Sequence, residues 1–126
     1  MEVTQVFVDK QVVISRDAFG TLSIAGSIDH FNSDAIAAWL ASQMQGVNGG
    51  GEIMDGDSNV TRQGDLVVEL GRLEFSDVSG IRALVRVAEN ARDGRRLVLR
   101  GLPPQIARVM SVVGWSELPS LVVEGP

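Results

Sequence analysis

The 126-residue sequence contains no cysteine and a single histidine, His30. The absence of cysteine excludes disulfides, thiol catalysis and cysteine-ligated zinc, and it fits a reducing compartment. A serine nucleophile needs a neighbouring base, and only His30 is available as an imidazole base. No G-x-S-x-G sequence surrounds any serine. We therefore expect His30 to be a surface or capping residue, and the sequence offers no nucleophilic triad.

Long apolar runs and a surplus of positive charge are also missing. No apolar stretch approaches the length required to cross a bilayer. The first nine residues lack the basic and apolar segments of a signal peptide. The formal net charge is −5, which repels phosphate backbones and anionic lipid. The sequence thus predicts a cytoplasmic protein whose partners are neither nucleic acids nor membranes.

The charges are distributed unevenly along the chain. Nine acidic residues and two arginines lie between positions 29 and 77, whereas seven arginines and two acidic residues lie between positions 82 and 108. This pattern has two interpretations: an ordinary solvated surface, or an electrostatically two-sided protein that docks a partner. Both stay open at the level of the sequence.

Alternating β-prone and amphipathic segments predict the fold. Two β-prone runs, 12–15 and 21–25, flank a turn that contains Gly20, which indicates a hairpin. The expected elements that follow are a helix from 32–35 to 45–46, a strand at 66–70, a helix from 81 to 94, a strand at 96–100, a helix from 103 to 114 and a strand at 121–124. This order, β-β-α-β-α-β-α-β, predicts one α/β domain over residues 1–126, with a mainly parallel sheet and an N-terminal hairpin.

The spacing of apolar residues predicts which face of each helix is buried. The expected core-facing residues are, in chain order, Ile36, Trp39, Leu40 and Met44; Ile81, Leu84, Val85 and Ala88; and Ile106, Val109, Met110 and Val113.

Residues 46–64 are the least periodic segment, and six of these nineteen residues are glycine. A loop of this length is uncommon in a compact domain and is either functional or mobile; we interpret it as a mobile insertion. Asp55 and Asp57 have the spacing of a calcium-binding loop, but Val60 and Leu66 stand where that loop needs Gly and Glu.

Other candidate chemistry is equally incomplete. The glycines at 49–51 lack the Lys and Ser/Thr of a phosphate-binding loop. Nothing in the sequence brings the carboxylates of Glu69 and Glu74 together. A small hydrolase that uses loop carboxylates and a metal therefore remains only a third alternative, and no cofactor is expected.

The segment Ser76-Asp77-Val78-Ser79-Gly80 separates an apolar strand from a helix. Ser and Asp are preferred helix N-caps, and a helix start offers unpaired N–H groups and the positive end of a dipole. Either Asp77 or Ser79 simply caps the helix, or the exposed loop is modified or docked. A phosphate on Ser79 would lie near the helix start and three residues from Arg82, both of which favour it. One polar stripe of the helix contains Ser79, Arg82, Arg86, Glu89 and Asp93.

Residues 75–85, FSDVSGIRALV, follow the pattern of an apolar strand, Asp, Ser or Thr, a small residue, Gly and an apolar helix. This pattern resembles the signature of STAS domains of the bacterial anti-sigma factor antagonist family. Residues 26–29 match the family's first-helix entry, and residues 97–104 and 106–114 are similar to its fourth strand and third helix. The resemblance implies a STAS-like fold and a binding module rather than an enzyme.

The resemblance also implies a protein partner. Such domains bind an anti-sigma factor that is also a serine kinase, and phosphorylation of the Ser or Thr after the Asp breaks the complex. In this chain that position is Val78, which cannot accept a phosphate. Two interpretations stay open: Ser79 or Ser76 is the substitute acceptor, or the domain binds its partner constitutively. The alternative function is a small-molecule sensor or scaffold without a phospho-switch.

The expected docking surface is the 76–80 loop together with the helix that follows it. Asp77 would orient the loop, and two residues at the start of the first helix would border the surface. The residues expected to take part are Asp29, Asn32, Asp77, Val78, Ser79, Gly80, Arg82 and Arg86. The identity of the partner and the oligomeric state are open.

Overall fold

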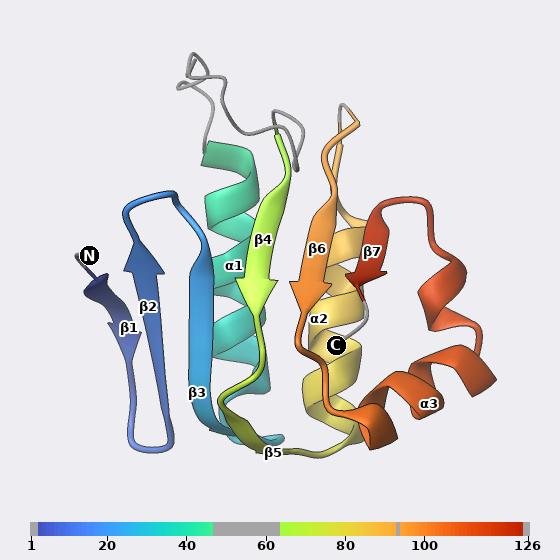
Figure 1. Cartoon of the computed structure of the whole chain (residues 1–126), viewed down its shortest axis with the longest axis horizontal. Helices are drawn as coiled ribbons and strands as arrows, with labels where there is room; N and C mark the ends of the chain where they lie inside the picture. The colour runs from blue at the N-terminus through green and yellow to red at the C-terminus, as the bar shows by residue number, and fades with distance from the viewer. Residues whose placement is uncertain (1–2, 47–63, 93, 125–126) are drawn as a thin grey trace.

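The computed structural model describes residues 3–46, 64–92 and 94–124, which build a seven-stranded sheet with helices packed against it (Figure 1). In chain order the elements are β1 (Val3–Val8), β2 (Val12–Asp17), β3 (Leu22–Ile28), α1 (Ser33–Gly46), β4 (Leu66–Glu69), β5 (Leu73–Ser76), α2 (Val78–Glu89), β6 (Leu97–Arg100), α3 (Pro104–Val112), the 3-10 turn η2 (Trp115–Glu117) and β7 (Leu121–Glu124).

The strands lie in the order β1-β2-β3-β4-β6-β7, and β5 pairs with β3 beside this path. The pairs β1–β2 and β2–β3 are antiparallel, and the other four pairs are parallel. The predicted α/β class, with a mainly parallel sheet and an N-terminal hairpin, is therefore confirmed. Gly20 in the hairpin turn has φ +87°, a conformation that favours glycine.

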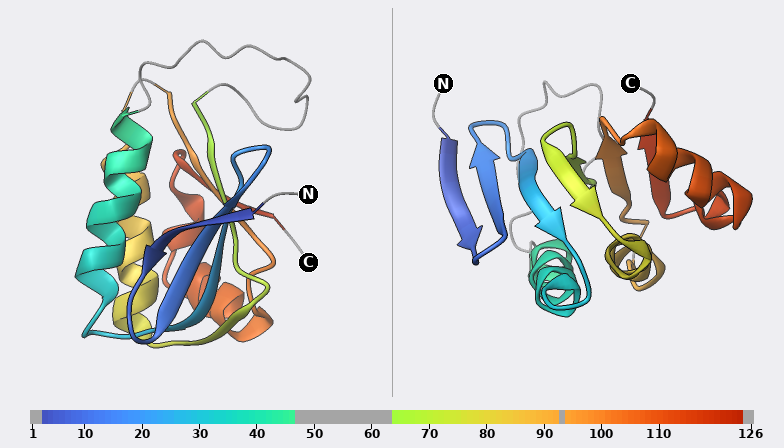
Figure 2. Two further views of the ribbon diagram at one scale, coloured as in Figure 1. Left: turned by 90° about the vertical axis from the view of Figure 1, so that its left-hand side faces the viewer. Right: turned by 90° about the horizontal axis from the view of Figure 1, so that it is seen from below.

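Both long helices lie on the same face of the sheet, whereas α3 lies towards the β7 edge (Figure 2). Alternate residues of the strands, such as Ile14, Ile24 and Leu99, are fully buried in one apolar cluster with α1 and α2, as the two-residue period of a strand requires. The core thus lies between the sheet and these two helices.

The predicted buried faces of α1 and α2 are confirmed, since Ile36, Leu40, Met44, Ile81, Leu84, Val85 and Ala88 are all buried and Trp39 is half-buried. The predicted end of the second helix at Gly94 is wrong, because α2 ends at Glu89. The Asn90 side chain donates to the Arg86 carbonyl at 3.0 Å, which satisfies a carbonyl of the last turn.

The predicted buried face of the third helix is wrong in part. Only Met110 of α3 is buried, and Ile106 is half-buried. Val109 and Val113 are 40% and 52% exposed. The reason is the position of α3 near the last strand, where the sheet does not extend under the whole apolar stripe of the helix (Figure 1).

The predicted element order lacks two strands that the structure contains, β1 and β5. The two ends of β3 pair with different strands: Leu22 lies opposite Val68 of β4, and Ile28 lies opposite Ser76 of β5. Gly26, which lies opposite Leu73 at the start of the β5-paired half, has φ +113°, and a Cβ there would lie 2.1 Å from the Gln11 carbonyl oxygen. Only glycine fits at this junction.

Two sequence-based expectations fall outside the described residues. Residues 47–63 comprise nearly all of the Gly-rich segment 46–64, including Asp55 and Asp57, and Asp93 is the last member of the predicted polar stripe. Within the described part of the chain, no helix is both long and apolar enough to cross a membrane.

Candidate docking surface at the start of α2

The two connections that carry the predicted site residues meet at one end of the sheet, where β3 and β5 end and where α1 and α2 begin (Figure 1). Ile28, the last residue of β3, lies opposite Ser76, the last residue of β5. The Asp77 N–H then donates to the Ile28 carbonyl at 3.2 Å. The 76–80 loop is therefore held against the end of the central strand β3.

Asp77 is the N-cap of α2, with extended backbone (φ −87°, ψ −177°). Its Oδ1 accepts the Gly80 N–H at 3.0 Å and the Ser79 hydroxyl at 2.6 Å. The hydrogen bond from Ser79, and then those from backbone N–H groups and the charge of nearby His30, lower the pKa of Asp77 below its ordinary value of 3.8, although partial burial opposes this. Asp77 is thus a carboxylate at neutral pH, at the helix end that favours negative charge.

Gly80 allows the first turn of α2 to pack tightly on the sheet. A Cβ at this position would lie 2.3 Å from the Ser76 Oγ and 2.8 Å from Cγ2 of Ile28. Both distances are shorter than any stable contact, so a side chain would push α2 away from β3. The glycine of the 76–80 loop is therefore required by packing.

At the start of α1, Asp29 and Asn32 hold their own turn in place. The Asn32 side chain is 3% exposed; it accepts the Asp29 N–H at 2.9 Å and donates to the Ser27 carbonyl at 3.0 Å. Asp29 accepts the Phe31 N–H at 2.9 Å and the Gln11 side-chain amide at 3.1 Å. Contact of Asp29 or Asn32 with a partner stays a prediction, and in the structure both side chains fasten the 29–32 turn to β3 and to the β1–β2 hairpin.

An exposed stripe runs up α2 from its first residue. Val78 is 63% exposed, and Arg82 and Arg86 follow at intervals of four, which places the three on one face of the helix. Both arginines are exposed, and within the described residues neither guanidinium group forms an ion pair or a hydrogen bond. The stripe thus begins at Val78, whereas Ser79 is half-buried against Asp77.

Two phenylalanines that the sequence analysis did not single out lie at the same end of the molecule. Phe31 is 80% exposed and Phe75 is 55% exposed. The ring of His30 lies against that of Phe31, with centroids 4.1 Å apart. Both phenylalanines stand beside polar turn residues and outside the apolar periodicity of any helix. This position in the sequence was the signal that could have indicated their exposure. Phe31, Phe75 and Val78 are thus three exposed apolar residues at the end of the molecule where α1 and α2 begin.

Several polar groups at this end of the molecule are bound to one another and to the backbone. The Ser79 hydroxyl donates to the Asp77 carboxylate, which also accepts the Gly80 N–H. Glu69 accepts the N–H of Gly71 in its own turn. Among the described residues, no three His, Asp or Glu side chains are grouped so that they could hold a metal ion. The surface offers exposed apolar side chains, two guanidinium groups and a firmly held backbone.

A family model described as "Mlab, STAS domain" matches residues 51–123, which is more than half of the chain. The matched range contains the 76–80 loop and α2, as well as β4 to β7. A comparison with curated proteins finds no match.

Proposed function

Because the chain belongs to the STAS domain family, we propose that it is a non-enzymatic regulatory module that binds a protein partner in the cytoplasm. The partner class implied by the resemblance to anti-sigma factor antagonists is an anti-sigma factor that is also a serine kinase. The proposed contact surface consists of the 77–80 loop (the last four residues of the 76–80 loop), the exposed stripe of Arg82 and Arg86, and Phe31 and Phe75 at the same end of the molecule.

One observation carries the proposal: exposed apolar side chains occur at the end of the molecule where α2 begins, and this helix carries two exposed arginines that have no ion pair within the described residues. Aromatic residues and arginine are enriched at protein interfaces and among the residues that dominate binding energy. Grouped exposed apolar residues mark interaction sites more often than single ones do. The complementary partner surface would have an apolar centre for Phe31, Phe75 and Val78 and acidic side chains facing Arg82 and Arg86.

We further propose that docking is constitutive. Val78 occupies the position where the family carries its phosphate acceptor, and it has no hydroxyl. A phosphate on Ser79 would replace the proton that binds Asp77 and would place negative charge beside that carboxylate. This repulsion opposes the favourable helix start and Arg82. The domain would therefore hold its partner without a phosphate-dependent release.

The test is calorimetric titration of the whole chain with the serine-kinase anti-sigma factors of the same genome. The double variant Arg82→Glu/Arg86→Glu should weaken binding at least about tenfold, since close charges across interfaces couple by more than about 1.4 kcal/mol. Arg108→Glu is the matched control, because Arg108 is an exposed arginine of α3. Unchanged affinity in the double variant would overturn the proposed surface.

The apolar half of the surface is tested separately. Phe31→Ala and Phe75→Ala remove exposed rings, so the free energy of unfolding should change little while affinity falls. Phe19→Ala is a suitable control, since Phe19 is 82% exposed in the β2–β3 turn, at the other end of β3. Equal losses in all three variants would argue against a localised apolar contact.

A specific observation favours the alternative function of a small-molecule sensor. A cavity of about 350 Å³ lies at the far end of α2 from the 77–80 loop, and this volume lies within the range of ligand-binding clefts.

A further inference from the structure

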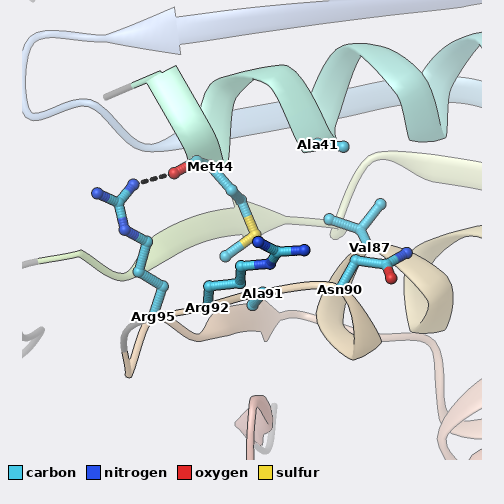
Figure 3. Close-up of a pocket in the computed structure, with 7 residues that line it drawn as sticks. All are labelled: Ala41, Met44, Val87, Asn90, Ala91, Arg92 and Arg95. Carbon is cyan, nitrogen blue, oxygen red and sulfur yellow. Dashed lines mark hydrogen bonds between the residues drawn. The ribbon is translucent and has the colours of Figure 1, made fainter. Parts of the chain in front are cut away.

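The cavity lies between the C-terminal ends of α1 and α2 (Figure 3). Its apolar wall includes Met44 of α1 and Val87 of α2, which are 4% and 3% exposed. Its polar rim consists of Asn90, Arg92 and Arg95, which come from the residues that directly follow α2. The cavity therefore combines a small apolar wall with a polar rim that carries two guanidinium groups.

Each guanidinium group of the rim is available to a ligand. Arg95 donates from Nη1 to the Met44 carbonyl, which satisfies one of the carbonyls left open at the end of α1 and holds the Arg95 guanidinium group at one side of the cavity, beside the end of that helix (Figure 3). One donor of its five is used in this bond. Arg92 is exposed and has no ion pair or hydrogen bond within the described residues, and Figure 3 shows it extending past the Met44 side chain.

The charge balance of the cavity favours an anion. The two guanidinium groups contribute two positive charges. The C-terminal ends of α1 and α2 each carry a partial negative charge of about one half from the helix dipole, which offsets part of this positive charge. No acidic side chain is among the described residues that line the cavity. A net positive charge of about one thus remains over an apolar wall. Arginine pairs of this kind bind carboxylates and phosphates through charge-assisted hydrogen bonds.

We propose that this cavity binds a small organic anion. Its carboxylate or phosphate head would lie between Arg92 and Arg95, and a short apolar part would lie against Met44 and Val87. The site shares no residue with the proposed docking surface, so it stands or falls independently of protein binding. It supplies the sensor alternative with a binding site and a class of ligand.

The probes are acetate, hexanoate, inorganic phosphate and butyl phosphate, each titrated into the ¹⁵N-labelled whole chain and followed by NMR chemical shifts. The proposal expects hexanoate or butyl phosphate to bind more tightly than its head group alone, because only these probes reach the apolar wall. The shifts should centre on the amides of Ala41, Val87 and Ala91. Comparison of hexanoate with butyl phosphate distinguishes a carboxylate ligand from a phosphate ligand.

Two variants separate the cavity from general surface charge. Arg92→Ala should weaken binding about tenfold, since it removes one charge-assisted contact without breaking an intramolecular bond. Ala41→Leu keeps every charge and fills the cavity from α1, so it should abolish the preference for hexanoate or butyl phosphate. Arg108→Ala on α3 is the control and should bind like the unmodified protein.

Circular dichroism establishes that each variant is folded. The proposal is overturned if none of the four probes binds at about 10 mM, the weak end of measurable affinity. It is also overturned if Ala41→Leu binds unchanged, or if the shifts spread evenly over all exposed arginines, because both results describe non-specific attraction to surface charge.

Discussion

The Ser79 hydroxyl donates a hydrogen bond of 2.6 Å to Oδ1 of Asp77, and the same oxygen accepts the Gly80 N–H at 3.0 Å. The Ser79 hydroxyl proton is thus already engaged in the N-cap of α2. Because the Asp77 N–H also binds the end of β3, the cap and the sheet are joined through one residue. The consequences for stability and for modification can be measured separately.

Removal of the Asp77 carboxylate should destabilise the fold in a pH-dependent way. Asp77→Ala should lower the free energy of unfolding by about 1 kcal/mol at pH 7, the usual cost of losing an N-cap. The pKa of Asp77 is lowered in the folded protein, so its charge stabilises the fold above the ordinary value of 3.8. This stabilisation is lost as the pH falls through the folded pKa. Urea titrations at several pH values between about 7 and 3 measure the difference.

Asp77→Asn is the matched control, because asparagine is also a good N-cap but carries no charge. It should cost less than Asp77→Ala, and the advantage of the unmodified protein over it should disappear in acid. A difference that stays constant across the whole pH range would contradict a role for the Asp77 charge.

Gly80→Ala should destabilise the protein, although the same change in a helix interior normally stabilises it by about 1 kcal/mol. The added methyl group would meet the Ser76 Oγ and the Ile28 side chain, and overpacking of this kind costs about 1–3 kcal/mol. Chemical denaturation gives the sign directly. The double variant Gly80→Ala/Ser76→Ala should recover part of the loss, since it removes the closer of the two contacts, whereas additive losses would count against this explanation.

If docking is constitutive as proposed, Val78→Ser should introduce a phosphate acceptor. Val78 is 63% exposed, so a hydroxyl there would be accessible to a kinase, while Ser79 is half-buried and bonded to Asp77. Incubation with the partner kinase and mass spectrometry of the 76–80 segment should show faster phosphorylation of the variant than of the unmodified protein. Equally fast phosphorylation of Ser79 in the unmodified protein would refute constitutive docking.

Arg96 and Asp65 form an ion pair whose two members should respond unequally to mutation. Two hydrogen bonds of 3.1 and 2.7 Å join them, and their side chains are 28% and 0% exposed. Arg96→Met leaves a buried carboxylate without this partner, whereas Asp65→Asn leaves a guanidinium group that reaches solvent. Arg96→Met should therefore lower the denaturation midpoint further than Asp65→Asn; the reverse order would contradict this account.

The sequence predicted those elements whose burial depends on local pattern. The apolar faces of α1 and α2 follow a helical period, and the hairpin is marked by Gly20. It predicted only one strand here, at 66–70, and missed β5, because Leu73–Ser76 is short and becomes a strand through its pairing with β3. The period of α3 was also correct, but burial of Val109 and Val113 depends on how far the sheet extends, which no local pattern records.

The candidate site was also predicted only in part: the sequence indicated the residues that act within one turn of chain and missed those that distant segments bring together. The cap residues of α2 could be recognised because Asp77, Ser79 and Gly80 act within one turn of chain. Phe31 was missed, because its exposure depends on the path of the turn between β3 and α1, and a helical or strand pattern does not record that path. Similarly, the cavity combines Met44 with Arg95, fifty-one residues apart in the chain.

The division of β3 between β4 and β5 has a consequence for what the family match covers. The matched range begins at residue 51, but the strand that pairs with β5 and accepts the Asp77 N–H ends at Ile28. A polypeptide that began at residue 51 would contain the whole signature and would lack the strand that positions it. The range that the family model matches therefore depends on β3, which lies outside it. A substitution at Ile28 would accordingly act on the position of the 77–80 loop, as would one within the loop.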